Sequence, residues 1–231
     1  MMPPIELIIL DLDGTLYDLN DVLPSVYETQ VSFLCKKTGK SREDVIAFLS
    51  KNHIYKEKTK DSKSATELFL SNGLSLSEWT LYRETHFDVT KIDKQKAANE
   101  KTIKNFSQFG AIVLLSSNAY SIIERILSHL SISPFIFKEI VCSDRFMADK
   151  PFTKKEAMKL LSAKYHTDFT NMISIGDRFE TDILPLLELG GHGVLLKSSS
   201  SISFLSDDFR SGKIASCSQY LYYGKMQGNR S

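Results

Sequence analysis

Short apolar runs alternate with helical patterns in the second half of the chain, and this alternation restricts the possible folds more than any other sequence feature. Four runs of strand length are separated by stretches in which apolar residues recur at helical spacing: AIVLLS, EIVCS, MISIG and GVLL. Strand and helix in strict alternation are typical of a parallel sheet covered by helices. We therefore predict an α/β fold with a Rossmann-like parallel sheet as its core.

A further strand and a helical insertion precede this region. The N-terminal run IELIIL has the same buried-strand character, so we expect it at the centre of the sheet. Residues 19–104 contain several helical patterns and no strand-like run of comparable strength. We predict a core domain of residues 1–18 and 105–231, with a smaller all-helical cap domain, residues 19–104, inserted after the first strand.

Composition narrows the expected partners and location. The 231-residue chain has 42% hydrophobic residues and a formal net charge of +1, so no bulk charge demands nucleic acid or a membrane surface. Its three cysteines are few and widely separated, which argues against a disulfide framework or a zinc site. The first apolar run is too short for a signal peptide or a membrane span. We expect a cytoplasmic protein, monomeric or weakly dimeric, that binds neither nucleic acid nor membrane.

Two carboxylates, Asp11 and Asp13, come directly after the first strand and are followed by Gly14. Open α/β sheets bind their ligands at the carboxyl ends of the strands. A buried, unpaired carboxylate there is costly or has a shifted pKa, unless a metal or a catalytic role compensates. A lone Asp-Gly pair is more often an Asx turn that merely ends a strand, so this motif needs support from other positions.

A second carboxylate pair follows the run MISIG, with Asp177 directly after the strand and Asp182 near the start of the next helix. Asp182 taken alone could simply complement the helix macrodipole. Two such pairs at neighbouring strand ends would repel each other, and a divalent cation resolves this repulsion. Oxygen ligands without a nearby histidine or cysteine select Mg²⁺, which we predict as the cofactor.

Two further loops carry groups suited to a phosphoryl group. Ser117 and Asn118 follow the run AIVLLS and offer a hydroxyl and an amide, and Lys150 precedes Pro151 in the loop after EIVCS. Taken singly, these residues are an ordinary turn and an ordinary surface lysine. Together with the carboxylates they supply the hydrogen-bond donors and the positive charge that a transferring phosphoryl group requires.

The chain resembles the haloacid dehalogenase superfamily, whose four motifs are matched in order by DLDGTL, Ser117-Asn118, Lys150-Pro151 and GDRFETD. The resemblance extends from Ile5 to about Leu196, which is almost the whole predicted core. It implies the α/β fold predicted above, with a helical cap between the first and second motifs. It also implies chemistry on a phosphate ester at the strand ends.

The resemblance assigns catalytic roles to four of these residues. Asp11 is implied as the nucleophile that forms an aspartyl phosphate, and Asp13 as the acid that protonates the leaving oxygen and then deprotonates water. Ser117 is implied to hydrogen-bond a phosphoryl oxygen, and Lys150 to hold the phosphoryl charge. Asn118 is a further candidate for substrate binding.

The resemblance also implies a Mg²⁺ site. Asp177 and a carboxylate oxygen of Asp11 are the expected side-chain ligands, together with the backbone carbonyl of Asp13. Asp182 is expected to bind the metal directly or through water. A single metal of this kind neutralises charge and orients the phosphate for in-line attack.

The same motifs bear on the substrate. Dehalogenases of the superfamily typically lack the second aspartate, so Asp13 favours a phosphomonoester, and the cap position favours a small soluble one such as a nucleoside monophosphate or a sugar phosphate. The start DLDGTLYD looks somewhat like the pyrimidine 5′-nucleotidase branch, and Tyr17 could stack on a base. A phosphotransferase or phosphomutase would use the same residues, and a catalytically silent binding module would keep the same fold.

Overall fold

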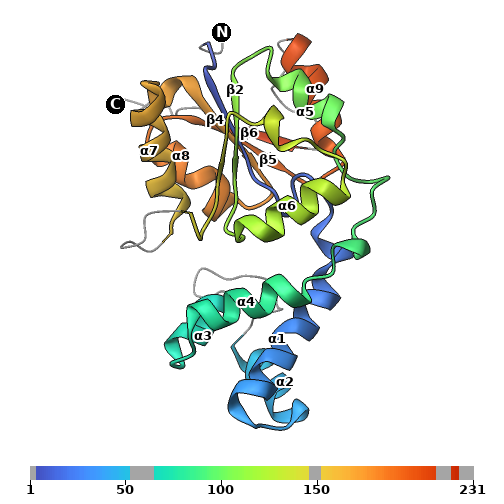
Figure 1. Ribbon diagram of the computed structural model, residues 1–231. Coiled ribbons are helices and arrows are strands. Elements are labelled where there is room, and N and C mark those ends of the chain that lie inside the picture. The colour runs from blue at the N-terminus through green and yellow to red at the C-terminus, as the bar shows by residue number, and fades with distance from the viewer. Residues whose placement is uncertain (1–3, 53–64, 146–151, 212–219, 224–231) are drawn as a thin grey trace. The chain divides into compact units, whose positions relative to one another are not determined.

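The chain divides into two compact units, residues 1–21 with 89–231 and residues 22–88. A computed structural model describes the ranges 4–52, 65–145, 152–211 and 220–223. Figure 1 shows a central sheet flanked by helices in the larger unit and helices alone in the smaller one. Each unit is therefore described by itself.

The larger unit contains a six-stranded sheet with the order β3-β2-β1-β4-β5-β6. Five strands are parallel and the edge strand β6 is antiparallel to β5. The strands are β1 (Leu7–Leu10), β2 (Ala111–Leu115), β3 (Glu139–Val141), β4 (Met172–Gly176), β5 (His192–Leu196) and β6 (Tyr220–Tyr223). The predicted α/β fold is confirmed, and β1 lies between β2 and β4 as expected of the most buried strand.

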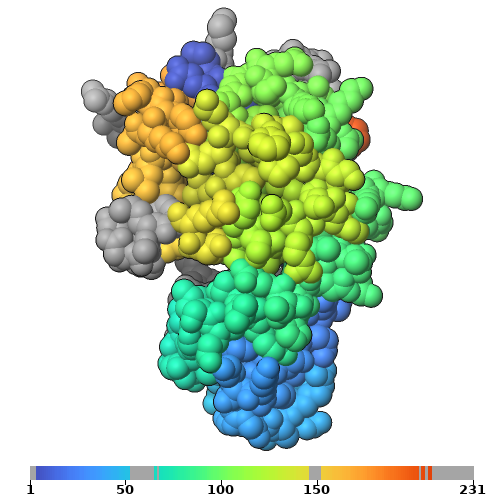
Figure 2. All heavy atoms as spheres, in the orientation of Figure 1, coloured from blue at the N-terminus to red at the C-terminus, as the bar shows by residue number. Residues whose placement is uncertain are grey.

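Helices cover both faces of this sheet (Figure 1). One face packs against α7 (Lys154–Tyr165) and α8 (Leu184–Glu188), whose apolar side chains join alternate residues of β1, β2 and β4 in one core cluster. In Figure 1, α5 (Glu100–Phe106), α6 (Tyr120–His129) and α9 (Ser201–Ser211) lie on the other side. In Figure 2 the face of the larger unit that is turned to the viewer is formed largely by atoms coloured green to yellow, from the part of the chain between α5 and α7. Burial on both faces explains the continuous apolar character of the strands.

Capping side chains explain where two of these helices begin. The capping-box spacing of Thr153 and Glu156 predicts a helix start soon after Lys150, and α7 begins at Lys154 with the Thr153 hydroxyl accepting the Glu156 backbone N–H at 3.2 Å. Asn99 caps α5 in the same way, accepting the Thr102 N–H at 2.9 Å. The first turn of α7 is thereby fixed close to the strand ends.

The smaller unit consists of helices packed around an aromatic core. Its helices are α1 (Leu23–Thr38), α2 (Arg42–Lys51), α3 (Ala65–Ser71) and α4 (Leu76–His86). Phe33, Phe69 and Trp79 are buried together, with ring centroids 4.8–5.6 Å apart. The indole N–H of Trp79 donates to the Thr66 hydroxyl at 3.1 Å. Among the described helices, none is long and apolar enough to cross a membrane.

The smaller unit, residues 22–88, begins three residues later than the predicted insertion and ends sixteen residues earlier. Residues 89–104 belong to the larger unit, whereas the sequence assigned them to the helical insertion. Backbone and side-chain hydrogen bonds tie this segment to the sheet domain: Ala98 N–H donates to the Leu16 carbonyl at 2.7 Å, and His129 contacts the Ile92 carbonyl at 3.1 Å. The segment has mostly irregular structure, so its sequence lacked the strand pattern that marked the rest of the domain.

Candidate active site

The order in which strands are added to the sheet changes direction at β1. The chain moves from β1 to β2 and β3 on one side, and β4 and β5 lie on the other side. Ligands of open α/β sheets bind at such a switch point, outside the carboxyl ends of the strands. Asp11 follows β1 and Asp177 follows β4, and these strands are neighbours in register from Leu7 with Met172 to Leu10 with Ile175. The two carboxylates are therefore adjacent.

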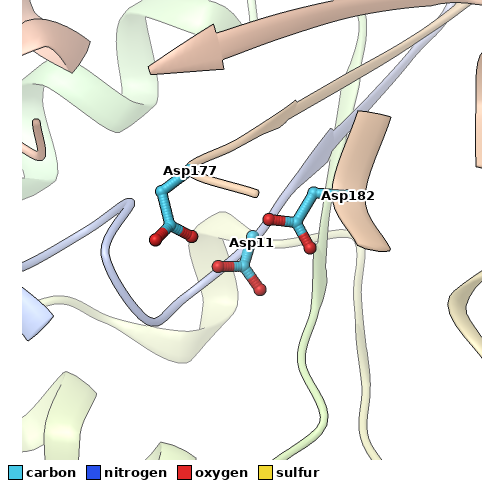
Figure 3. Close-up of side chains that lie close together, drawn as sticks. All are labelled: Asp11, Asp177 and Asp182. Carbon is cyan, nitrogen blue, oxygen red and sulfur yellow. The ribbon is translucent and has the colours of Figure 1, made fainter. Parts of the chain in front are cut away.

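Three carboxylates gather at this point. Asp11, Asp177 and Asp182 each offer an oxygen within 4.8 Å of the others, and Figure 3 shows their side chains converging from β1, the end of β4 and the following turn. Asp11 and Asp182 are 7% and 2% exposed. Three of the four carboxylates that the sequence predicts to converge thus lie together, and Asp13 is not one of them.

Burial perturbs the titration of this cluster. Desolvation raises the pKa of Asp11 from 3.8 to about 8; the charges of Asp182 and Asp13 act in the same direction, and Lys154 opposes them. Desolvation and the charge of Asp182 also raise the pKa of Asp177, to about 6. Both carboxyls therefore hold protons more tightly than free aspartate, and a bound cation would favour the ionised forms.

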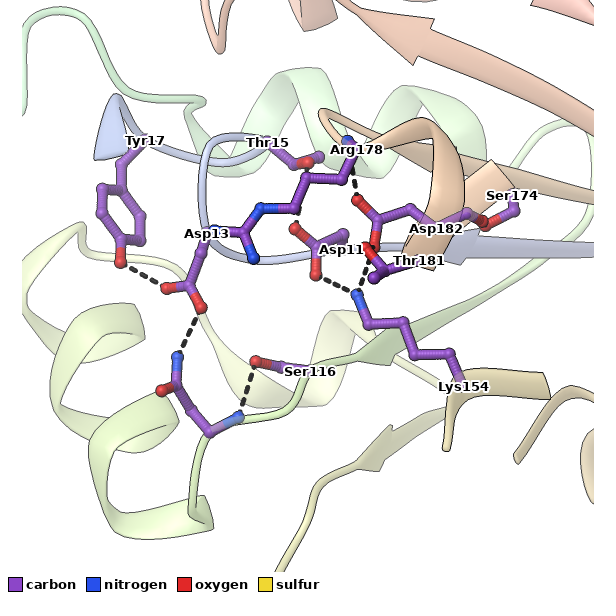
Figure 4. A network of polar contacts seen from close by, with 11 residues as sticks. Asp11, Asp13, Thr15, Tyr17, Ser116, Lys154, Ser174, Arg178, Thr181 and Asp182 are labelled. Atoms are coloured by element: carbon purple, nitrogen blue, oxygen red, sulfur yellow. Dashed lines mark hydrogen bonds and ion pairs between the residues drawn. The ribbon is translucent and has the colours of Figure 1, made fainter. Parts of the chain in front are cut away.

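Lys154 is the cation that the structure places in this cluster. Its ammonium donates to Oδ1 of Asp11, and to Oδ1 of Asp182 at 2.8 Å (Figure 4). The side chain is only 10% exposed. Burial alone would lower the pKa of Lys154, but the charges of the two aspartates outweigh it and raise the pKa above its usual range. Lys154 is therefore held as a buried ammonium ion against the predicted nucleophile.

The hydrogen bonds of Asp182 and Asp177 differ. Oδ1 of Asp182 accepts from Lys154 and from the Thr181 hydroxyl at 2.9 Å, and Oδ2 accepts the backbone N–H of Arg178 at 2.9 Å. Oδ1 of Asp177 is buried, and no hydrogen-bond donor reaches it among the described residues. A buried carboxylate oxygen without a donor fits a metal ligand, since an unsatisfied polar atom there is otherwise costly. Asp177 thus has an oxygen to offer a cation, whereas Asp182 is already satisfied.

Gly14 allows the loop after β1 to approach Asp177. Its φ of +79° lies in the left-handed region, and a Cβ built on it would lie 2.3 Å from Oδ2 of Asp177. Any other residue would therefore be strained and would push the carboxylate aside. The glycine after the two aspartates is needed for the packing of the acidic cluster itself.

Asp13 lies outside this cluster and is held by two other side chains. The hydroxyl of Tyr17 donates to Oδ1 of Asp13, and the amide of Asn118 donates to Oδ2 at 2.7 Å (Figure 4). Tyr17 and Asn118 are buried, whereas Asp13 is partly exposed. The two predicted carboxylates of the first motif thus have separate surroundings, Asp11 beside a lysine and acids, and Asp13 beside neutral donors.

Of the other predicted residues, the structure describes Ser117 and Tyr17 but not Lys150. Ser117 is exposed, and the hydroxyl in the network is that of Ser116, which is fully buried and accepts the Asn118 backbone N–H at 3.2 Å. Ser116 is the first residue beyond β2, as Asp11 is beyond β1. Tyr17 has no exposed ring face for stacking on a base, because the side chain is 0% exposed. Lys150 lies outside the described residues, so its role stays a prediction.

Sequence reasoning missed Lys154, although one signal pointed to it. Lys154 is the first residue of α7, where a positive charge opposes the helix macrodipole. A lysine at this position is unfavourable unless an acid pairs with it. The acids that follow β1 and β4 provide this pairing.

Comparison with known proteins identifies the family. A family model for haloacid dehalogenase-like hydrolases matches residues 5–190. No curated protein matches the sequence significantly. The chain therefore belongs to the haloacid dehalogenase-like hydrolases, and the predicted family is confirmed.

Solved structures share the fold at low sequence identity. A haloacid dehalogenase-like hydrolase from Xanthomonas campestris is 13% identical, with a TM-score of 0.54 over 92% of this chain and 95% of that one. A phosphatase of the family from Thermococcus onnurineus is 16% identical, with a TM-score of 0.57 over 83% and 86% of the two chains. A family enzyme from Bacteroides thetaiotaomicron, solved with magnesium and inorganic phosphate, is 15% identical, with a TM-score of 0.50 over 84% and 95%. At these identities the likeness shows the fold alone.

Proposed function

We propose that this protein is a Mg²⁺-dependent phosphatase that hydrolyses a small soluble phosphomonoester through an aspartyl phosphate on Asp11. The observation that carries the proposal is the pair of carboxylates after β1 in separate surroundings, Asp11 in the acidic cluster and Asp13 between neutral donors. Hydrolysis of a phosphate ester needs both a nucleophile and a proton donor for the leaving oxygen. Displacement of halide needs the nucleophile alone.

The proposed reaction has two steps. An Asp11 oxygen attacks phosphorus while the bond to the leaving oxygen breaks, and that oxygen takes a proton from Asp13. Water then attacks the phosphorus, Asp13 takes a proton from it, and the bond to Asp11 breaks to release phosphate. The ammonium of Lys154, already against Asp11, is proposed to balance the phosphoryl charge in both steps.

Asp177 and Asp11, with the backbone carbonyl of Asp13, are the proposed Mg²⁺ ligands. The donor-free oxygen of Asp177 and the all-oxygen surroundings support this assignment. A bound Mg²⁺ would act as a Lewis acid and a template for the phosphate. Asp182, whose oxygens already accept three hydrogen bonds, is proposed to hold Lys154 and to contact the metal at most through water.

The helical unit of residues 22–88 is proposed to act as the cap that the resemblance implies, excluding water and contacting the substrate. If it closes on a ligand, Mg²⁺ with a phosphate mimic should reduce the radius of gyration measured by small-angle X-ray scattering. An unchanged radius would count against a closing cap.

The test of the function is Mg²⁺-dependent release of phosphate from a panel of nucleoside monophosphates, sugar phosphates and an aryl phosphate. We expect turnover by the native chain and none by Asp11→Asn. A primary alcohol added as acceptor separates hydrolysis from phosphoryl transfer, because transfer yields a new ester in place of phosphate. Halide release from a 2-haloacid, with no phosphate release from any ester, would overturn the proposal in favour of dehalogenation.

A further inference from the structure

Asp13 is the only carboxylate of the site, among the described residues, whose two oxygens both accept hydrogen bonds from neutral side chains. Tyr17 donates to Oδ1 and Asn118 donates to Oδ2 at 2.7 Å. Within the acidic cluster, by contrast, Asp11 and Asp182 share an ammonium ion. Both oxygens of Asp13 are therefore held by side-chain hydrogen bonds that constrain its orientation.

The two donors are themselves fixed by the fold. Tyr17 is completely buried, and its backbone forms a bridge with Asp13. Asn118 is 4% exposed; its backbone N–H donates to the Ser116 hydroxyl at 3.2 Å and its carbonyl accepts the Ser143 N–H at 3.2 Å. Rigid donors that hold a partly exposed acceptor form a clamp, because the side chain between them has lost its rotational freedom.

We infer that Tyr17 and Asn118 are positioning residues that clamp Asp13 for proton transfer to the leaving oxygen. This inference rests on the proposed phosphatase function. The clamp holds the Asp13 carboxyl in one orientation, so that its proton can be directed at the leaving oxygen. As the P–O bond breaks, the leaving oxygen takes its electron pair and the Asp13 proton, so the charge moves onto the clamped carboxylate.

The inference predicts a dependence on the leaving group. A primary alkyl phosphate such as glycerol phosphate releases a strongly basic alkoxide unless the acid protonates it. Dinitrophenyl phosphate releases a stable anion and needs no proton. The value of kcat/KM reports formation of the aspartyl phosphate, so loss of the clamp should lower kcat/KM for the alkyl ester and leave that for the aryl ester nearly unchanged.

The test compares Tyr17→Phe and Asn118→Ala with the native chain on both esters in excess Mg²⁺. We expect each variant to lose about 10–100-fold in kcat/KM on the alkyl ester and less than about threefold on the aryl ester. Tyr165→Phe is the matched control, because its hydroxyl donates to Oε2 of Glu139 at 2.8 Å in the same kind of tyrosine–carboxylate bond. This control should leave kcat/KM unchanged on both esters.

Two further readouts separate positioning from damage to the site. Mg²⁺ affinity measured by titration calorimetry should match that of the native chain, and a crystal structure of Tyr17→Phe should show Asp13 in a different rotamer or in several. If the tyrosine variant does not fold, the asparagine variant still tests the other half of the clamp. If the native chain is active and the variants lose kcat/KM equally on the two esters, the clamp is overturned and the proposed function is not. No turnover of either ester by the native chain would overturn the proposed function and the clamp with it.

Discussion

Replacing Asp177 with asparagine should stabilise the metal-free protein at alkaline pH. Burial and the neighbouring Asp182 raise the pKa of Asp177 from 3.8 to about 6, which means that its ionised form is unfavourable in the folded state. A folded state that holds this proton more tightly than the unfolded chain is favoured below the unfolded pKa, and that stabilisation is lost as the pH rises through about 6. The asparagine side chain carries no charge and avoids this loss.

The magnitude follows from the pKa. A rise from 3.8 to about 6 corresponds to a ceiling of about 3 kcal/mol in the free energy of unfolding at about pH 8. The carboxyl is partly exposed, so screening by solvent reduces the expected gain to about 1–2 kcal/mol. For a chain of this length, that gain raises Tm by about 2–6 °C.

The assay is thermal unfolding of the native chain, Asp177→Asn and Glu180→Gln at about pH 8 and about pH 4, in chelator and in excess Mg²⁺. Glu180 is exposed in the same turn, so its replacement removes an equal charge as a control. In chelator, Asp177→Asn should have a higher Tm than the native chain, by a larger margin at about pH 8 than at about pH 4. Mg²⁺ should raise the Tm of the native chain and of the control, and have little effect on Asp177→Asn. A variant less stable than native at the higher pH, or one that Mg²⁺ stabilises as strongly, would refute the reasoning.

Three further outcomes follow from the same cluster. Lys154→Met should lower kcat/KM by about 100-fold or more. It should also destabilise the fold, most strongly at high pH, because Asp11 then ionises without its partner. The control Lys159→Met, on the exposed face of α7, should match the native chain in steady-state kinetics and in thermal unfolding. Gly14→Ala should lower both the Mg²⁺ affinity measured by calorimetry and the free energy of unfolding. Gly39 has a similar φ but open space around it, so Gly39→Ala should lower the free energy of unfolding by only about 1 kcal/mol. Mg²⁺ binding near pH 7 should release protons from the aspartates whose pKa is raised. The binding enthalpy measured by calorimetry should then depend on the buffer near pH 7 and become independent of the buffer at high pH. A binding enthalpy that is the same in all buffers near pH 7 would contradict the raised pKa values.

The fold was predictable because its signal is periodic and local. The central parallel strands β1, β2 and β4 are buried almost throughout, so each appears in the sequence as a continuous apolar run, and helical spacing separates the runs. The antiparallel strand β6 and the segment 89–104 were not predicted. Neither belongs to the alternation, and the position of each depends on contacts with distant parts of the chain, such as the pairing of Leu195 with Leu221.

The site was predictable where a residue directly follows a strand. Asp11 and Asp177 occupy such positions, and the common edge of parallel strands brings them together regardless of the loops beyond. Ser116 occupies the same kind of position after β2 and was not predicted, because the resemblance pointed to the pair Ser117-Asn118. Lys154 belongs to a helix start several residues beyond its strand, so which lysine of that segment reaches Asp11 depends on where the Thr153 cap fixes α7.

The hydrogen-bond partners of the carboxylates distinguish them more clearly than their spacing in the sequence does. Asp182 has donors on both oxygens, Asp177 has a buried oxygen with none among the described residues, and Asp13 is held between neutral donors. A buried carboxylate oxygen without a donor is costly unless a cation binds it. The four acidic residues therefore differ in their hydrogen-bond partners. Asp11 and Asp182 share a lysine, Asp13 has neutral donors, and one oxygen of Asp177 has no donor among the described residues. The roles proposed above for Asp13 and Asp177 can fail independently, because they depend on different hydrogen-bond partners.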